Sequence, residues 1–398
     1  MEKLNNYVNT LFEIAIDYSL QVDSVEVKSV TDSEMNDLLV KGYEKRPFVS
    51  KDEKIETSNY HPEIFIIGIP HIIYLNEQND LELNLLSVAH GLAHADFVNR
   101  NVFLKELHTY KHQIDTEFIP FLNDVLQIEG KERVNQLFQQ LSPISLYTSS
   151  PIHQSIFQME SRWYEHFLTE AVVKELNRNE FTNVALYETI IDRSKKLTGW
   201  EKDFALFLSV EAVYFYGIKK TKLMNEGWAS YWQMELLKQL QLKREEKFKL
   251  ALLEANMHRK AEQGMNMYSL GKRLWEQVPK QRLFEVSEEN CDVTFLHHFY
   301  NESVHHEEQI SSIRQTNTGE KIIATEYESV KDELLQFYLF DKPLLSLNDG
   351  LTKRSGYLTI QYVNEPYQIR PDDLMSFKQR ISDLLNEKIY IKPMGAIL

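Results

Sequence analysis

The chain has 398 residues, of which 43% are hydrophobic and 12% aromatic, so it can bury a substantial core and exceeds the size of one ordinary domain. Lys and Arg total 44 against 59 Asp and Glu, which gives a formal net charge of -15. This acidic balance argues against nucleic acids and anionic membranes as binding partners, because both are held by cationic side chains. The single cysteine, Cys291, excludes an internal disulfide and a multi-cysteine zinc site.

The N-terminal segment and the apolar runs predict a soluble protein of the cytoplasm. Residues 1–20 lack the basic, apolar and small-residue order of a signal peptide. The most apolar stretches, residues 65–75 and 204–218, are too short to span a bilayer. We therefore expect a cytoplasmic protein without a membrane span.

Helical periodicity dominates most of the chain. Residues 3–20 predict an amphipathic helix, residues 44–61 a polar loop, and residues 63–75 one or two short strands. From residue 81 to about residue 283, apolar side chains recur mostly at helical spacing. The fold class expected for residues 1–319 is therefore a mainly helical domain with a short β element near its N-terminus.

The pattern changes after about residue 320. Short apolar and β-branched runs predict strands, and an amphipathic stretch predicts a helix over residues 372–386. A turn signal, Asn348-Asp349-Gly350, lies between two of the strands. We predict a small α+β domain over residues 320–398. Its strands are expected at residues 321–326, 335–340, 357–363 and 388–391.

The first candidate site is the pair His90 and His94, in the run HGLAHADFVNRN. Residues four apart lie on one face of a helix, with about 5–6 Å between their Cβ atoms, so two imidazoles there can reach one ion. The surrounding stripe is apolar, and burial favours the neutral ring that binds metals. Two satisfied core histidines remain the alternative. Asp96 and Asn101 add polar groups at the end of the same segment.

The second candidate is Glu211, which lies in the apolar run of residues 204–218 at a position where helical periodicity calls for a Leu. A buried carboxylate must be paired, protonated or bound to a metal, because burying it alone costs several kcal/mol. A salt bridge to a core Arg or Lys is one interpretation. The other is a role as a metal ligand or a general base.

The third candidate is the run NEGWASYWQ over residues 225–233. On a helix Glu226 and Gln233 share a face, and Gly227 lets another backbone come close. Two histidines from one helix and a glutamate from a later one form a known catalytic zinc set, with a fourth position for water. The alternative is a tightly packed helix start capped by Asn225. Further site candidates are aromatic or acidic: Trp228, Tyr231, Glu160 and Glu165.

Both runs resemble the signature of the stage V sporulation protein R family. Weaker similarity extends through much of the chain. The resemblance implies a cytoplasmic bacterial protein with a part in spore cortex formation, in a family without a settled biochemical activity. Two departures mark a divergent branch: the family's aromatic–Trp–His ending is Trp232-Gln233 here, and the aromatic and histidine cluster expected near residues 45–60 is largely missing.

A more distant likeness connects the two histidines and the later glutamate to zinc peptidases, and implies a zincin-like helix arrangement. In those enzymes a glutamate after the first histidine activates the water, whereas this chain has Gly91, so we predict Glu211 as the base. One hypothesis is a metal-dependent hydrolase in which His90, His94 and Glu226 bind a divalent metal, with zinc expected. Its substrate would be an amide in a peptide or a cell-wall precursor. The other is a non-catalytic sporulation factor that binds a partner protein.

Overall fold

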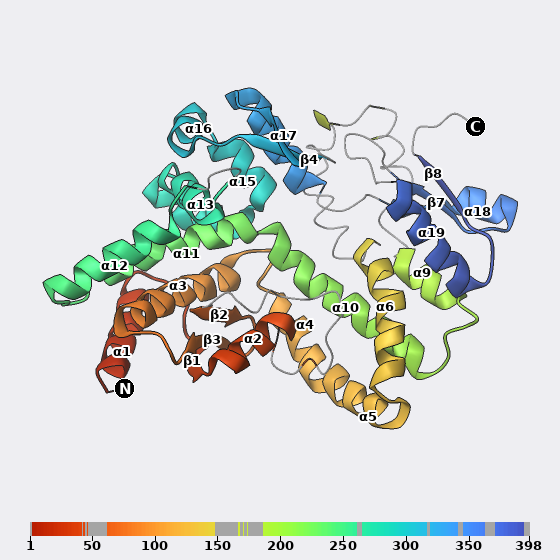
Figure 1. Ribbon diagram of the computed structural model, residues 1–398, viewed down its shortest axis with the longest axis horizontal. Helices are drawn as coiled ribbons and strands as arrows, with labels where there is room; N and C mark the ends of the chain where they lie inside the picture. Colours follow the sequence, from red (N-terminus) through yellow and green to blue (C-terminus); the bar gives the residue numbers. More distant parts are fainter. Residues whose placement is uncertain are drawn as a thin grey trace. The chain divides into compact units, whose positions relative to one another are not determined.

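The computed structural model (Figure 1) describes residues 2–41, 43, 46, 62–147, 166–167, 170, 173, 186–260, 265–316, 319–340, 345–362 and 371–393. Two site candidates, Glu160 and Glu165, and nearly all of the loop predicted over residues 44–61 lie outside these residues.

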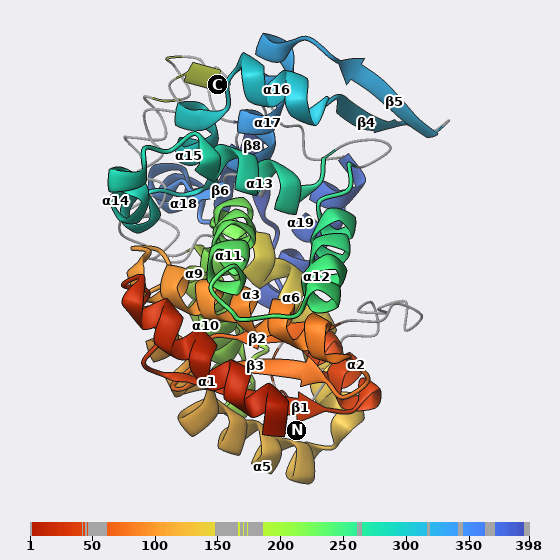
Figure 2. The same ribbon diagram turned by 90° about the vertical axis from the view of Figure 1, so that its left-hand side faces the viewer.

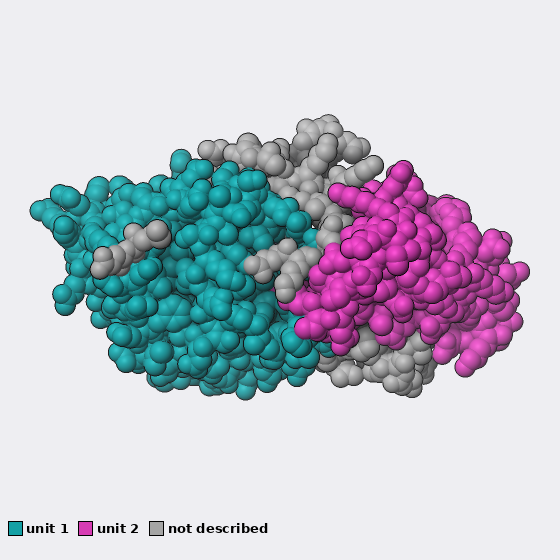
Figure 3. Space-filling view, turned by 90° about the horizontal axis from the view of Figure 1, so that it is seen from below, with its two compact units in different colours: residues 1–112, 217–335 teal, residues 113–216, 336–398 magenta. Residues whose placement is uncertain are grey.

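Spatial contacts group the chain into two compact units, coloured teal and magenta in Figure 3. Unit 1 takes residues 1–112 and 217–335, and unit 2 takes residues 113–216 and 336–398. Each unit thus combines two separate stretches of chain. The boundary predicted between residues 319 and 320 stays a prediction.

Unit 1 is built on helices α3 (Leu81–Arg100) and α11 (Lys222–Leu237), which pack side by side (Figures 1 and 2). Every residue of α3 from Leu85 to Val98 is buried, which is the pattern of a helix surrounded by protein. The other helices of this unit, of which α4 and α17 reach its boundaries, are α1 (Glu2–Asp17), α2 (Asp32–Lys41), α4 (Leu107–Gln113), α12 (Arg244–Met257), α13 (Met267–Glu276), a 3-10 turn (Lys280–Arg282), α14 (Leu283–Glu289), α15 (Asp292–Phe299), α16 (Glu302–Glu308) and α17 (Tyr327–Leu339).

A three-stranded sheet of order β1-β3-β2 supports α3 in unit 1. Strand β3 pairs in parallel with β1 and antiparallel with β2. A separate antiparallel pair is formed by β4 and β5. The bounds of these strands are β1 (Val25–Val30), β2 (Glu63–Ile66), β3 (His71–Asn76), β4 (Ser312–Thr316) and β5 (Gly319–Ala324).

Glycine permits a close crossing of α11 and α13, as predicted for Gly227. A Cβ atom built on Gly227 would lie 2.3 Å from the backbone carbonyl carbon of Gly271. The two helices therefore touch through their backbones, which only residues without a side chain allow. This contact sets the depth at which α11 sits against α13.

Unit 2 combines helices with the small α+β region near the C-terminus. Its three-stranded sheet has the order β6-β7-β8, with β6 and β7 antiparallel and β7 and β8 parallel. Its elements, including α10, which crosses the boundary between the units, are a π-helix (Ile114–Phe118), α5 (Ile119–Glu129), α6 (Lys131–Tyr147), α9 (Leu186–Arg193), α10 (Trp200–Lys220), β6 (Leu345–Leu347), α18 (Asp349–Ser355), β7 (Thr359–Tyr362), α19 (Pro371–Leu385) and β8 (Tyr390–Pro393).

The predicted fold class, mainly α with a small C-terminal α+β region, is confirmed. The strand predicted at residues 335–340 is wrong, because this stretch belongs almost entirely to α17. A short apolar run does not distinguish a buried strand from a buried helix segment. The zincin-like helix arrangement stays a prediction. In the part of the chain that the structure describes, no helix is long and apolar enough to cross a membrane.

Candidate metal centre

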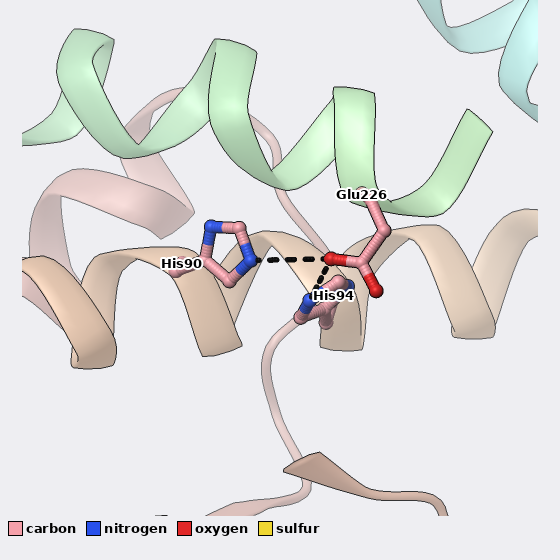
Figure 4. A group of neighbouring side chains, drawn as sticks. All are labelled: His90, His94 and Glu226. Atoms are coloured by element: carbon pink, nitrogen blue, oxygen red, sulfur yellow. Dashed lines mark ion pairs between the residues drawn. The ribbon is translucent and has the colours of Figure 1, made fainter. Parts of the chain in front are cut away.

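Helices α3 and α11 bring together the three residues predicted to bind a metal (Figure 4). His90 and His94 lie one turn apart on α3, and Glu226 reaches toward both rings from α11. The Oε2 atom of Glu226 lies 3.6 Å from Nε2 of His90 and 3.6 Å from Nε2 of His94. The three ligand atoms all lie within 4.8 Å of one another. No second group of this kind occurs among the described residues.

The other ring nitrogen of each histidine has a carboxamide partner. Nδ1 of His90 lies 2.8 Å from Oε1 of Gln233, and Nδ1 of His94 lies 2.9 Å from Oδ1 of Asn225. A carboxamide oxygen only accepts hydrogen bonds, so each Nδ1 donates its proton. In the neutral ring, Nε2 then keeps its lone pair for the centre. Metal-binding histidines are held in this way by partners on their second nitrogen.

These hydrogen bonds also decide two sequence interpretations. Gln233 stands where the signature of the resembling family has a histidine, and it accepts the hydrogen bond from Nδ1 of His90. Asn225 is not the cap of α11, because that helix begins at Lys222. At the start of α11, the backbone amides of Leu223 and Met224 donate instead to the Asp292 carboxylate, each at 2.9 Å.

The two histidines of the cluster have pKa values shifted in opposite directions. Burial acts to lower the pKa of His90, but the carboxylates of Glu63 and Glu226 outweigh it and raise this pKa above 6.5. Burial, reinforced by the charge of His90, lowers the pKa of His94 from 6.5 to about 4. Burial acts to raise the pKa of Glu226, but the hydrogen bond from His90 and the two histidine charges lower it overall. At pH 6.5, His90 is therefore mostly protonated and paired with Glu226, while His94 is neutral.

Two residues that the sequence did not single out, Glu63 and Tyr268, line the same centre. Glu63 is the first residue of β2, and its Oε1 atom lies 3.8 Å from Nε2 of His90. Burial raises the pKa of Glu63, against the opposing effects of His90 and a hydrogen bond from Ser87. The ring of Tyr268, on α13, lies 6.0 Å from that of His90. The Glu226 carboxylate, burial and the Glu63 carboxylate raise the pKa of Tyr268.

The side chains around the centre differ in exposure. The side chains of His90 and His94 are 4% and 9% exposed, whereas those of Glu226 and Glu63 are 18% and 21% exposed. The imidazoles are thus shielded, while the two carboxylates reach solvent. Catalytic zinc sites combine three protein ligands with an open position for water, whereas structural sites are closed by four. This donor set matches the open kind.

Position 91, which holds a glutamate in zinc peptidases, points at the sheet. A Cβ atom on Gly91 would lie 2.6 Å from Cδ1 and 2.7 Å from Cγ1 of Ile73, on β3. A side chain at this position would therefore require the Ile73 side chain to shift. The close packing of α3 on β3 favours glycine here.

Asp96 and Trp228 bind each other and do not join the donor group. The Trp228 indole donates to Oδ2 of Asp96 at 3.0 Å, while Oδ1 accepts from the backbone amide of Gln21 at 2.7 Å and from Nε of Arg100 at 2.6 Å. Burial raises the pKa of Asp96, partly offset by Arg100. This buried carboxylate thus connects α3, α11 and the segment after α1.

Asn101 and Tyr231 also lie outside the donor group. The Asn101 amide donates to the backbone carbonyls of Ser287 at 2.7 Å and Asn290 at 2.9 Å, which joins the end of α3 to α14. Tyr231 is half-buried on α11. Burial and nearby carboxylates, led by that of Glu235, raise its pKa.

Glu211, predicted as the general base, lies on α10 within unit 2, whereas the donor group lies in unit 1. Its side chain is buried, with 5% of the residue exposed. Glu211 is not one of the three residues whose ligand atoms converge. Its role as a base stays a prediction.

Comparison with known proteins places the chain in a family. The family model described as SpoVR like protein matches residues 1–342. A curated relative, the uncharacterised protein YcgB of Escherichia coli strain K12, is 22% identical over 258 residues, covering 55% of this chain and 50% of the relative. The chain thus spans about half the length of that relative. No solved structure matches significantly. Since the family model covers most of the sequence, the chain belongs to the SpoVR-like protein family, and this membership supports a sporulation-associated role.

Proposed function

We propose that this SpoVR-like protein is a metal-dependent hydrolase in which His90, His94 and Glu226 hold a divalent metal, with zinc expected. The supporting observation is the convergence of three ligand atoms within 4.8 Å, with both histidine Nδ1 groups already bound to carboxamides. Ligand atoms held about 2.0–2.1 Å from one tetrahedral zinc ion lie about 3.3 Å from each other. The two 3.6 Å separations to Glu226 are close to that spacing.

A metal bound here polarises a carbonyl and lowers the pKa of its water. The protein supplies the remaining requirements. Gln233 and Asn225 hold the two imidazoles in the required tautomer, so no reorientation is needed when a ligand enters. The exposed side of the centre, next to the carboxylates, is where a substrate can approach.

The substrate class we propose is an amide bond in a peptide or a cell-wall precursor, within formation of the spore cortex. This part of the proposal rests on the sporulation family and on the likeness of the donor set to that of zinc peptidases. It does not depend on YcgB, which is itself uncharacterised.

A non-catalytic sporulation factor that binds a partner protein is the second candidate. One observation favours it: protonated His90 and the Glu226 carboxylate already form an ion pair, so this carboxylate has a partner without a metal. In that case the polar centre would stabilise unit 1, and function would reside on the surface.

Elemental analysis of protein purified without chelator or a nickel column tests the proposal. We expect about one zinc or other transition metal per chain. A His90→Ala/His94→Ala variant that folds like the wild-type protein should lose this metal. A wild-type protein that takes up no metal, even after incubation with zinc or manganese, would leave the partner-binding factor as the better account.

A further inference from the structure

A zinc hydrolase with this donor set needs a carboxylate next to the attacking water, and α3 does not provide it. Gly91 faces Ile73, so a glutamate directly after His90 would point into the packing of α3 against β3. The base must therefore come from an element that faces the donor group from outside α3. Strand β2 is such an element, because its first residue reaches the centre.

Glu63 lies beside the ligand atoms without being one of them. Its Oε1 atom is 3.8 Å from Nε2 of His90. It is nevertheless absent from the group in which every ligand atom lies within 4.8 Å of every other. This is the placement required of a base, which must reach a bound water but not occupy its position.

The surroundings of Glu63 hold it in place. In the antiparallel pair of β2 with β3, Glu63 is the partner of Leu75, which is buried. The Glu63 carboxylate also contacts His90 of α3, with Oε1 3.8 Å from Nε2. The residue is thus fixed from the sheet and from α3 and keeps an exposed fraction of 21% toward solvent.

We infer that Glu63 is the general base of this centre, an assignment that rests on the proposed metal-dependent hydrolase. Glu63 takes one proton from the attacking water while the water oxygen forms a bond to the amide carbon. The carbon–nitrogen bond then breaks, and Glu63 gives the proton to the departing nitrogen. One water is consumed, a carboxylic acid and an amine are formed, and Glu63 returns to its starting state.

Two binding measurements on the full chain separate a base from a fourth ligand. The first is the zinc affinity, by competition with a chromophoric chelator. The second is the affinity of the zinc-loaded protein for acetohydroxamate, a probe that chelates zinc and hydrogen-bonds to an adjacent carboxylate. Both are compared for wild type, Glu63→Gln, Glu63→Asp and Glu226→Gln. Glu77→Gln serves as the matched control, because Glu77 is an exposed glutamate after β3.

The expected result is that Glu63→Gln binds zinc within about tenfold of wild type, whereas Glu226→Gln loses about a hundredfold or more. Acetohydroxamate should bind Glu63→Gln at least about tenfold more weakly, as the loss of a charge-assisted hydrogen bond requires. Glu63→Asp keeps the carboxylate and should lose less than Glu63→Gln. Glu77→Gln should match wild type in both measurements.

Three results would overturn the inference. A zinc loss in Glu63→Gln as large as that in Glu226→Gln would make Glu63 a fourth ligand and the centre a closed, structural one. Retained zinc with unchanged acetohydroxamate affinity would remove the base role alone and leave the metal centre intact. A wild-type protein that binds no zinc would remove the proposed metal centre itself, a failure that the wild-type measurement identifies separately.

Discussion

The Gln233 carboxamide accepts a hydrogen bond from Nδ1 of His90 at 2.8 Å, and this bond joins α11 to α3 directly behind the donor group. His94 has the same relationship to Asn225, at 2.9 Å. Helix α11 therefore supplies one member of the donor group, Glu226, and the hydrogen-bond partners of both histidines. A displacement of α11 would therefore disturb all three members of the donor group together.

Replacing Gln233 with Met should lower zinc affinity by about 10- to 100-fold, the usual effect of losing the outer partner of a ligating histidine. The Met side chain fills a similar volume but cannot accept the Nδ1 proton. Gln233→Glu keeps an acceptor oxygen and should retain more affinity than Gln233→Met. Titration with a competing chelator measures both, and equal affinities in the two variants would contradict this role for Gln233.

Zinc binding should release a proton and strengthen as pH rises. The pKa of His90 is raised above 6.5, so at pH 6.5 its Nε2 carries a proton that must leave before a metal binds. Below that pKa, zinc affinity should rise up to about tenfold per pH unit and level off above it. His94, with a pKa of about 4, adds a dependence only near pH 4 and below. Calorimetry at pH 6.5 in buffers of different ionisation enthalpy counts the protons, and a count near zero would refute the protonation of His90.

Gly91→Ala should destabilise the protein by about 1–3 kcal/mol, because its Cβ overlaps Ile73 on β3. Helix propensity alone would make Ala about 1 kcal/mol more favourable than Gly. A decrease in the free energy of unfolding would therefore show that the contact with Ile73 outweighs helix propensity. In an Ile73→Ala background the same substitution should cost less, since the overlapping atoms are gone. Urea denaturation of the four proteins gives the coupling energy. Strictly additive effects would argue against the contact.

Gly227→Ala should cost more than Gly91→Ala, on the order of 3 kcal/mol or above, because the atom it meets belongs to the backbone of Gly271 and cannot rotate away. Gly350→Ala is the control, since its Cβ meets Asn348 at an ordinary 3.6 Å. The added Cβ should also move α11 away from α13, and this displacement should weaken zinc binding in the folded protein. Thermal unfolding and chelator competition provide the two readouts, and wild-type values in both would disprove the close crossing.

Asp96→Ala should destabilise the protein by about 3–5 kcal/mol, because it leaves the Arg100 charge and the Trp228 indole without their buried acceptor. Its zinc stoichiometry, measured on the folded fraction, should remain that of wild type. Asp96→Asn keeps one acceptor oxygen and should be milder. A variant of wild-type stability that fails to bind zinc would instead assign Asp96 to the ligands.

The sequence by itself predicted which three residues form the donor group, because their arrangement is mostly local. His90 and His94 share a face through the helical repeat alone, and Glu226 was recognised within an unusual run of residues. Helical periodicity also predicted the mainly α class and the burial of Glu211. These features follow from spacing along one element and need no knowledge of what packs against it.

The tertiary structure alone decided which other residues face the ligands. Glu63 begins a short apolar strand and Tyr268 lies on a separate helix, so only the pairing of β2 with β3 and the crossing of α11 with α13 bring them to His90. Asp96, two residues after His94 in the sequence, instead binds Arg100 and Trp228. Side-chain convergence depends on strand register and helix crossing between distant segments, and local periodicity carries no information about either.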